Sequence, residues 1–117
     1  MLNVAIVGTG GISHAHIGAY LQFPEQCRIV ALIDIIPGKA QRVKEQYHLS
    51  GAEVFLDYHD MLDLDIDLVD VCTPPFVHAE ISISALRAGK NVVCEKPMAA
   101  SLEECDAMLK ARDESGK

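Results

Sequence analysis

The chain has 117 residues, half of them apolar, which is enough for one domain with a buried core over residues 1–117. Its formal net charge of -7 provides no positive field for nucleic acid or for an anionic membrane surface. No apolar run is long enough to span a bilayer, and the first residues lack the positive segment of a secretion signal, so we expect neither a membrane protein nor a secreted one.

The cysteine pattern gives a prediction about the compartment. Cys27, Cys72, Cys94 and Cys105 are widely spaced and form no Cys-x-x-Cys pair, and Cys72 and Cys94 end apolar runs. This pattern is typical of reduced thiols and not of a disulfide framework or a metal site. We therefore expect a cytoplasmic protein.

An apolar run over residues 3–7 ends in glycines, and an apolar-periodic segment follows. This predicts a buried strand, a tight turn at Gly8 and a helix that begins near Gly11. Gly10 has no Cβ, so a pyrophosphate can approach the backbone and meet the free N–H groups and positive dipole end of the helix. Ser13 takes the third position of the dinucleotide fingerprint, where Gly or Ala is usual, and is small enough for close packing. The predicted phosphate-binding residues are Gly8, Thr9, Gly10, Gly11, Ile12 and Ser13.

The segment after this turn predicts a helix that Pro24 terminates. Two histidines, His14 and His16, lie in its first turns, where histidines are more often surface or satisfied core residues than catalytic ones. The apolar positions near helical spacing are Ile12, Ala15, Ala19, Tyr20 and Phe23.

A second strand is predicted over residues 28–33, and Asp34 follows it at the spacing typical of a ribose-binding acid. Its carboxylate can accept from both adenosine ribose hydroxyls, at about 1.5–3 kcal/mol per bond. A 2′-phosphate about 4 Å away would be repelled by about 1–4 kcal/mol, and Ile35 and Ile36 offer no cation to bind it. We therefore expect NAD in preference to NADP. The alternatives are a ligand-free glycine turn and a turn-forming aspartate.

The next helix is predicted to start with Pro37 at its first position. Its inward stripe consists of Ile36, Ala40, Val43 and Tyr47, and its solvated face consists of Lys39, Arg42, Lys44 and Glu45. A short strand over residues 53–56 and a brief helix over residues 58–62, capped by Asp57, come next. The acidic residues 63–67 are interpreted as a solvated loop, without need of a metal.

A strand over residues 68–72 is broken by Thr73, Pro74 and Pro75, and a helix over residues 76–88 follows. These three residues either end the strand or also form a rigid wall beside a nicotinamide ribose. His78 is a candidate for the same site, although a surface position is the commoner interpretation. The last strand covers residues 91–94, and Glu95 and Lys96 leave its end. A capping box at Ser101 starts the final helix.

Five apolar strands that alternate with helices predict an α/β fold, a doubly wound parallel sheet of Rossmann type. The ligand crevice of such a sheet lies outside the carboxyl ends of its strands. Every unusual segment of this chain lies at such an end: the Gly8 turn, Asp34, residues 73–75 and residues 95–97. At this edge Lys96 could orient a substrate hydroxyl, stabilise an oxyanion or exchange a proton, or it could be a solvated cation.

Four blocks of this sequence resemble the amino-terminal domain of the Gfo/Idh/MocA family of nicotinamide-dependent sugar and polyol oxidoreductases. They are residues 7–13 with His16, Asp34, residues 69–75 with His78, and residues 88–97. The resemblance implies that the glycine turn binds the pyrophosphate and that Asp34 binds ribose. The further cofactor-binding candidates, from their place at the same edge, are Thr73, Pro74, Pro75, His78 and Glu95. The resemblance also implies that Lys96 lies beside nicotinamide and substrate and assists hydride transfer, and that the Lys96–Pro97 peptide bond is cis.

The resemblance further implies a sixth strand and a second, mostly antiparallel α+β domain that holds most substrate contacts. The chain ends before both, so we expect a truncated domain that binds NAD without turnover. Its last strand is then an open edge, which predicts a homo-oligomer. A stand-alone dinucleotide sensor remains an alternative function. A methyltransferase is a third hypothesis, and the glycine spacing and the Lys-Pro pair disfavour it.

Overall fold

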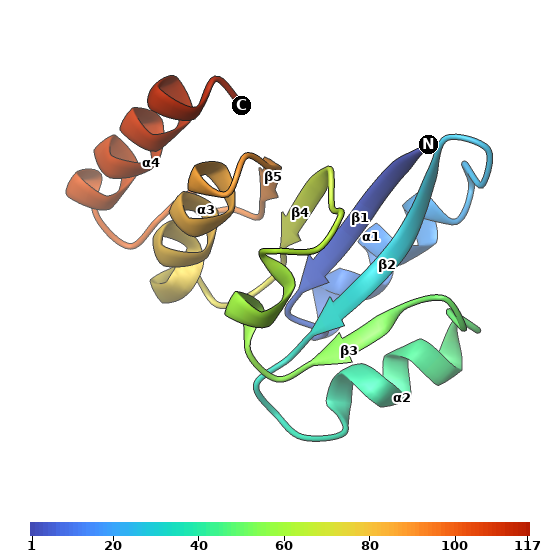
Figure 1. Cartoon of the computed structure of the whole chain (residues 1–117). Helices are drawn as coiled ribbons and strands as arrows, with labels where there is room; N and C mark the ends of the chain where they lie inside the picture. Colours follow the sequence, from blue (N-terminus) through green and yellow to red (C-terminus); the bar gives the residue numbers. More distant parts are fainter.

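The computed structural model describes all 117 residues and consists of one five-stranded parallel sheet with helices on both faces (Figure 1). The strand order is β3-β2-β1-β4-β5, the doubly wound arrangement that the sequence predicts. The strands are β1 Leu2–Val7, β2 Cys27–Ile33, β3 Glu53–Phe55, β4 Leu68–Val71 and β5 Asn91–Cys94.

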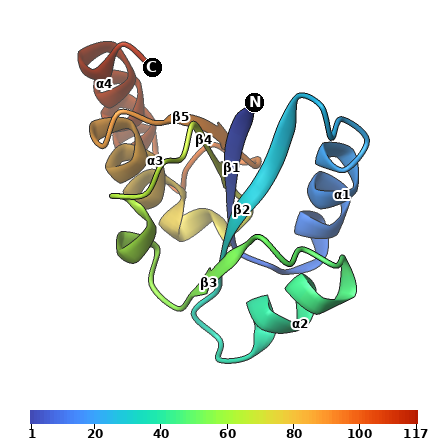
Figure 2. The ribbon, with the colours of Figure 1, turned by 45° about the vertical axis from the view of Figure 1, so that its right-hand side comes forward.

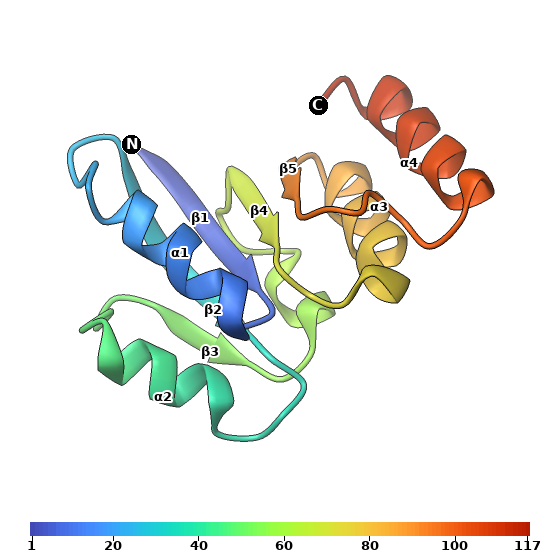
Figure 3. The ribbon, with the colours of Figure 1, turned by 180° about the vertical axis from the view of Figure 1, so that it is seen from behind.

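The helices form a layer on each side of the sheet, which the views in Figures 2 and 3 separate. The elements α1 and α2 cover one face, whereas η1 and α3 cover the other, and α4 packs outside α3. No helix is long and apolar enough to cross a membrane. The helical elements are α1 Gly11–Tyr20, α2 Lys39–Gln46, η1 Tyr58–Met61, η2 Pro75–Val77, α3 His78–Arg87 and α4 Leu102–Ser115.

The central strand β1 is apolar on both faces because both faces are covered. Val4 and Ile6 join the core beneath α1 and α2, and Ala5 and Val7 join the core beneath η1 and α3. Side chains alternate along a strand, so a continuous apolar run supplies both cores at once. This anchors the carboxyl end of β1, from which the glycine turn leaves, in the middle of the sheet.

Two helix boundaries differ from the prediction. Helix α1 ends at Tyr20, before Pro24. Phe23 and Ile12 are exposed, whereas Ile17 is the fully buried apolar residue of this helix. Helix α2 begins at Lys39, because Gly38 forms its N-cap with φ of +81°, so Pro37 lies outside the helix. The predicted stripes therefore gave the right helices with shifted ends.

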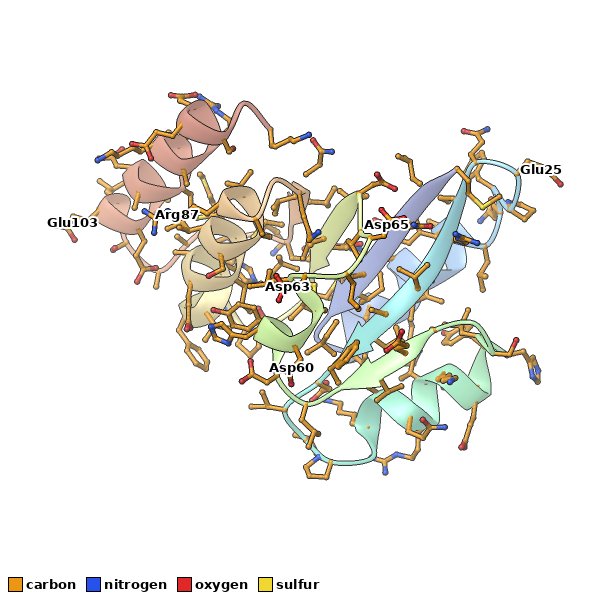
Figure 4. The ribbon with its side chains drawn as sticks, in the orientation of Figure 1. Glu25, Asp60, Asp63, Asp65, Arg87 and Glu103 are labelled. Carbon is orange, nitrogen blue, oxygen red and sulfur yellow. The ribbon has the colours of Figure 1, made fainter.

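The acidic segment before β4 lies away from the carboxyl edge. Asp63 and Asp65 are exposed on the connection from η1 to β4, and both are labelled in Figure 4. Asp65 Oδ2 accepts from the side chain of Asn3 at 3.3 Å, and Asp67 accepts from the Asn3 N–H at 2.8 Å. These carboxylates thus secure the amino end of β1, in agreement with their interpretation as a surface loop.

Candidate functional site

The glycine turn at the end of β1 has room for no side chain at its first position. Gly8 has a φ of +91°, and its N–H donates to the carbonyl of Ile33 at 2.8 Å. A Cβ at Gly8 would lie 2.9 Å from backbone atoms of both Cys72 and Thr73. The chain can therefore cross between the ends of β2 and β4 only with glycine here.

Three consecutive N–H groups, those of Gly10, Gly11 and Ile12, have no acceptor in the structure. They lie at the start of α1, where Gly10 is the N-cap and provides no side-chain cap. Ser13 is fully buried, and its hydroxyl donates to the Gly10 carbonyl at 2.6 Å, so it shapes the turn from the inside. Unpaired amides at the positive end of a helix are suited to a phosphate group.

Asp34 links the ends of β1 and β2. Its Oδ2 accepts from the N–H and the hydroxyl of Thr9, at 3.0 and 2.8 Å, and its Oδ1 accepts from the Ile36 N–H at 3.0 Å. Burial raises the pKa of Asp34, but the N–H groups of Ile36 and Thr9, the Thr9 hydroxyl and the charge of Lys39 lower it further, so the pKa lies below 3.8 on balance. The residue is an anion that holds the turn in place.

This arrangement determines which polar groups of Thr9 and Asp34 are already used within the chain. Thr9 is 1 % exposed and directs its polar groups to Asp34, away from the open side of the turn. A carboxylate has about four acceptor positions, and three on Asp34 are occupied by the protein itself. The carboxylate as folded has one position left, on Oδ1, rather than the two required for both ribose hydroxyls.

Lys39, which the sequence places on a solvated face, lies beside this carboxylate. Its ammonium is 3.9 Å from Asp34 Oδ2, and it is also the nearest group to a Cβ built at Gly10. The first turn of α2 brings it there, because Gly38 turns the chain back toward the end of β1. The Lys39 cation therefore accompanies the Asp34 anion at this edge. The sequence did not indicate this pairing, because the residues directly after Asp34 are apolar.

A cavity of about 650 Å³ opens between the glycine turn, the end of β2 and the start of α3. It contains Gly8, Gly10, Asp34, Thr73 and Pro74 among its lining residues, so the structure brings these five predicted residues together. Most of the remaining wall is apolar, including Ile35, Ile36, Leu56, Phe76 and Val77. The buried Thr73 hydroxyl has no hydrogen-bond partner. An apolar cavity with a few convergent polar groups is typical of a nucleotide site.

The other predicted residues lie outside this cavity. Pro75 begins the short helix η2, and Glu95 and Lys96 follow β5 on the far side of β4. Lys96 is exposed and forms no ion pair, and the Lys96–Pro97 bond is cis, as the family resemblance implied. The carboxyl edge thus has an enclosed end at Asp34 and an open end at Lys96.

His78 is not a surface residue. It is 0 % exposed at the start of α3, with Nε2 2.8 Å from the carbonyl of Thr73 and Nδ1 2.8 Å from the carbonyl of Pro97. The surface position that the sequence favoured for His78 is therefore wrong, and His78 is not among the residues that line the cavity. The residue ties two loops of the edge together from beneath.

His16 lies in a polar cluster that sequence reasoning missed. Its Nδ1 is 2.7 Å from Asp70 and its Nε2 is 2.7 Å from Glu95, while the Tyr20 hydroxyl donates to Asp70 at 2.8 Å. The Cys72 thiol lies 3.5 Å from both His16 and Asp70. Burial, and next the negative Asp70, raise the pKa of Tyr20 and of Cys72, so both stay protonated donors. The donors and acceptors satisfy one another as a hydrogen-bond network.

Comparison with known proteins agrees with this geometry. The chain matches, over residues 2–117, the sequence model of an oxidoreductase family with an NAD-binding Rossmann fold, GFO_IDH_MocA. It is 33% identical to inositol 2-dehydrogenase of Salmonella paratyphi B over 99% of this chain and 34% of that protein. It is 36% identical to an inositol 2-dehydrogenase/D-chiro-inositol 3-dehydrogenase of Lactiplantibacillus plantarum over 97% of this chain and 33% of that one.

Solved structures give the same result. The WlbA dehydrogenase of Bordetella pertussis, in complex with NADH and UDP-GlcNAcA, has a TM-score of 0.91 at 35% identity, over 98% of this chain and 34% of that chain. A levoglucosan dehydrogenase in complex with NADH has a TM-score of 0.85 at 34% identity, and the match covers 94% of this chain and 31% of that chain. The chain thus spans about a third of the length of the curated relatives it matches.

The close approach of Gly8 to the backbone of Cys72 and Thr73 predicts that a side chain at this position destabilises the chain. Gly8→Ala combines a positive φ with a clash against the backbone of Cys72 and Thr73, so it should lower the free energy of unfolding by about 1–3 kcal/mol or more. Gly11→Ala is the matched control, since nothing lies within 4 Å of its added Cβ. Urea unfolding checks both variants, and equal stabilities would contradict the geometry.

Proposed function

This chain belongs to the Gfo/Idh/MocA oxidoreductase family, and from that membership we propose that it is the nucleotide-binding part of an NAD-dependent dehydrogenase for a sugar, a polyol or a related hydroxy compound. The observation that carries the proposal is the set of unpaired N–H groups at Gly10, Gly11 and Ile12, the first of which belongs to a residue that lines the cavity with Asp34. NAD, when bound, supplies the hydride acceptor for the oxidation of a hydroxyl group.

The pyrophosphate is proposed to lie on the three free amides at the start of α1. Gly10 has no side chain between the backbone and the cavity, and the nearest group to its Cβ position is the Lys39 ammonium at 3.8 Å. Amide N–H groups, a helix dipole and a cation then act on one anionic group. Gly8 and Ser13 contribute by fixing the turn, not by contact.

The adenosine is proposed to fill the apolar part of the cavity. Ile35, Ile36 and Leu56 form a wall there, and 83% of Ile35 is exposed, so a planar base would cover apolar surface. The free acceptor position on Asp34 Oδ1 suits one ribose hydroxyl. A 2′-phosphate would approach the same carboxylate, which supports NAD over NADP, although Lys39 offsets part of the repulsion.

The nicotinamide and the substrate are proposed to lie toward Lys96. From Asp34 at the end of β2, the carboxyl edge passes Thr73 and Pro74 after β4 and ends at Lys96 after β5. A dinucleotide with its pyrophosphate on the central turn extends in both directions along this edge. An ammonium without an ion-pair partner is available to orient a substrate hydroxyl and to stabilise the alkoxide character that develops as hydride leaves.

Titration with dinucleotides tests the cofactor proposal. The purified chain should bind NADH about fivefold or more tightly than NADPH, the lower limit of a 1–4 kcal/mol repulsion, and should not bind S-adenosylmethionine. Lys39→Met should widen the NADH preference by removing the positive charge near Asp34, and Lys44→Met, on the last turn of the same helix, should leave it unchanged. Fluorescence or calorimetry provides the constants. Equal affinities for NADH and NADPH would overturn the preference.

Activity of the chain is a separate prediction. We expect the purified 117-residue chain to bind NAD but to show no NADH formation with myo-inositol or levoglucosan, because its carboxyl edge is open beside the exposed Lys96. Absorbance of NADH at saturating NAD provides the measurement. Turnover above a Lys96→Met control would show that a substrate site is already complete in these residues.

Self-association is proposed through β5. This strand pairs with β4 alone, lies at the edge of the sheet, and presents Val93 with 43% of its surface exposed. An unpaired apolar edge can continue its ladder with a second copy. We predict reversible dimers in sedimentation velocity that Val93→Lys converts to monomers. A wild-type chain that stays monomeric at high concentration would refute this.

A further inference from the structure

We propose that His16 and His78 are positioning residues that together hold Lys96 at the carboxyl edge, each by tying a residue next to Lys96 to β4 or to the loop that follows it. The inference deepens the proposed function, since it rests on the role given there to Lys96. Its first observation is a symmetry of contacts: Glu95 and Pro97, the two neighbours of Lys96, each lie 2.7–2.8 Å from a histidine nitrogen.

The His16 arm runs from α1 to Glu95. Nδ1 of His16 contacts Asp70, a fully buried residue of β4, and Nε2 contacts Oε1 of Glu95. The second oxygen of Glu95 accepts the N–H of Lys96 at 3.1 Å. An unbroken series of hydrogen bonds therefore joins the core strand β4 to the backbone of Lys96.

The His78 arm runs from α3 to Pro97. Nε2 of His78 lies 2.8 Å from the carbonyl of Thr73, just after β4, and Nδ1 lies 2.8 Å from the carbonyl of Pro97, just after Lys96. Both carbonyls are acceptors, so a ring with one N–H donates to one of them and an imidazolium donates to both. The ring has no exposed surface. The two histidines thus approach the Lys96 segment from α1 and α3, which lie on opposite faces of the sheet.

Little else restrains this segment. β5 ends at Cys94, and one further backbone bond, from the Glu95 N–H to the Val71 carbonyl at 3.0 Å, extends the ladder. Lys96 itself is exposed and has no ion pair. Without the histidines the segment would be held by that backbone bond, by the local bond from the Lys96 N–H to Glu95 and by weak contacts of the Cys94 thiol with the carbonyls of Glu95 and Met98, at 3.4 and 3.8 Å. These restraints are too few to hold a group within the tolerance that catalysis requires.

The His16 arm depends on protonation. A neutral imidazole has one N–H, whereas both nitrogens of His16 face carboxylate oxygens, so only the imidazolium donates to both. Burial lowers the pKa of His16, but hydrogen bonds to Asp70 and Glu95 and the charges of both raise it more, to above 6.5 on balance. The other titratable groups around it are the Tyr20 hydroxyl and the Cys72 thiol, both neutral.

The direction of the pH effect follows from burial. Because the pKa of His16 is raised in the folded chain, its bonds to Asp70 and Glu95 are both present below pH 6.5. One of them is lost as the pH rises through the raised pKa. Asp70 is fully buried and cannot be hydrated, whereas 23% of the Glu95 side chain is exposed and can be. The proton should therefore leave Nε2, which frees Glu95 and loosens Lys96.

Nuclear magnetic resonance of the whole chain tests this arrangement. In the wild type the Lys96 amide should be as rigid as β5, with an order parameter of about 0.85 that falls below about 0.6 in His16→Gln and in His78→Gln. His59→Gln is the matched control, because the exposed His59 ring contacts neighbouring Asp57 and Tyr58 and neither of the Lys96 neighbours, so it should leave the Lys96 order parameter unchanged. If His78→Gln does not fold, Glu95→Ala, at a partly exposed position, breaks the other arm.

A pH titration of the wild type needs no variant. The His16 imidazole and the Lys96 amide nitrogen should titrate together, with one midpoint above 6.5, and His16→Gln should abolish that step at Lys96. An order parameter that is unchanged in the variants, or a Lys96 shift that is flat through the His16 midpoint, would overturn the proposal. Failure of NADH to bind would instead refute the proposed function, so the two outcomes are distinguishable.

Discussion

The carboxylate of Asp34 is the interaction on which the carboxyl edge of this sheet depends. It accepts the N–H and hydroxyl of Thr9 and the N–H of Ile36, so one buried anion fixes both the turn after β1 and the turn after β2. Hydrogen bonds to a charged group contribute about 1.5–3 kcal/mol each. Because Thr9 is held inward, the next three amides face outward without partners. The row of free amides is thus a consequence of how the Asp34 carboxylate is satisfied.

This view explains why Asp34 and Lys39 occur together. An anion enclosed among apolar residues is unfavourable unless donors and a counter-charge accompany it. The donors come from Thr9 and Ile36, and the counter-charge comes from the first turn of α2. The same pair then presents both signs of charge to a ligand, which moderates any discrimination that the carboxylate alone would exert.

The sequence predicted those parts of the structure that depend on local chemistry. Apolar strands that alternate with helices, together with the right-handed crossover rule, predicted the doubly wound sheet. The positions of Gly8 and Asp34 after two of these strands predicted the turn and its acid. The rest depends on register between distant segments. His16 meets Asp70 across 54 residues and Glu95 across 79, and Lys39 meets Asp34 only because Gly38 reverses the chain. His78 was taken for a surface residue because a single histidine in a helix has no periodic signal that distinguishes a buried position.

Helix α1 has a role at both ends of the edge, and this follows from its length and packing. The first amides of this helix are free, while His16 and Tyr20, in its second and third turns, contact Asp70 on β4. Ile17 between them is fully buried in the core beneath the sheet. One ten-residue helix, anchored in the core by an apolar residue in its middle, therefore carries both the free amides and the His16 contacts. Through His16 it also reaches Glu95, on the other side of β4. The free amides and the Lys96 segment are thus connected by one packed element.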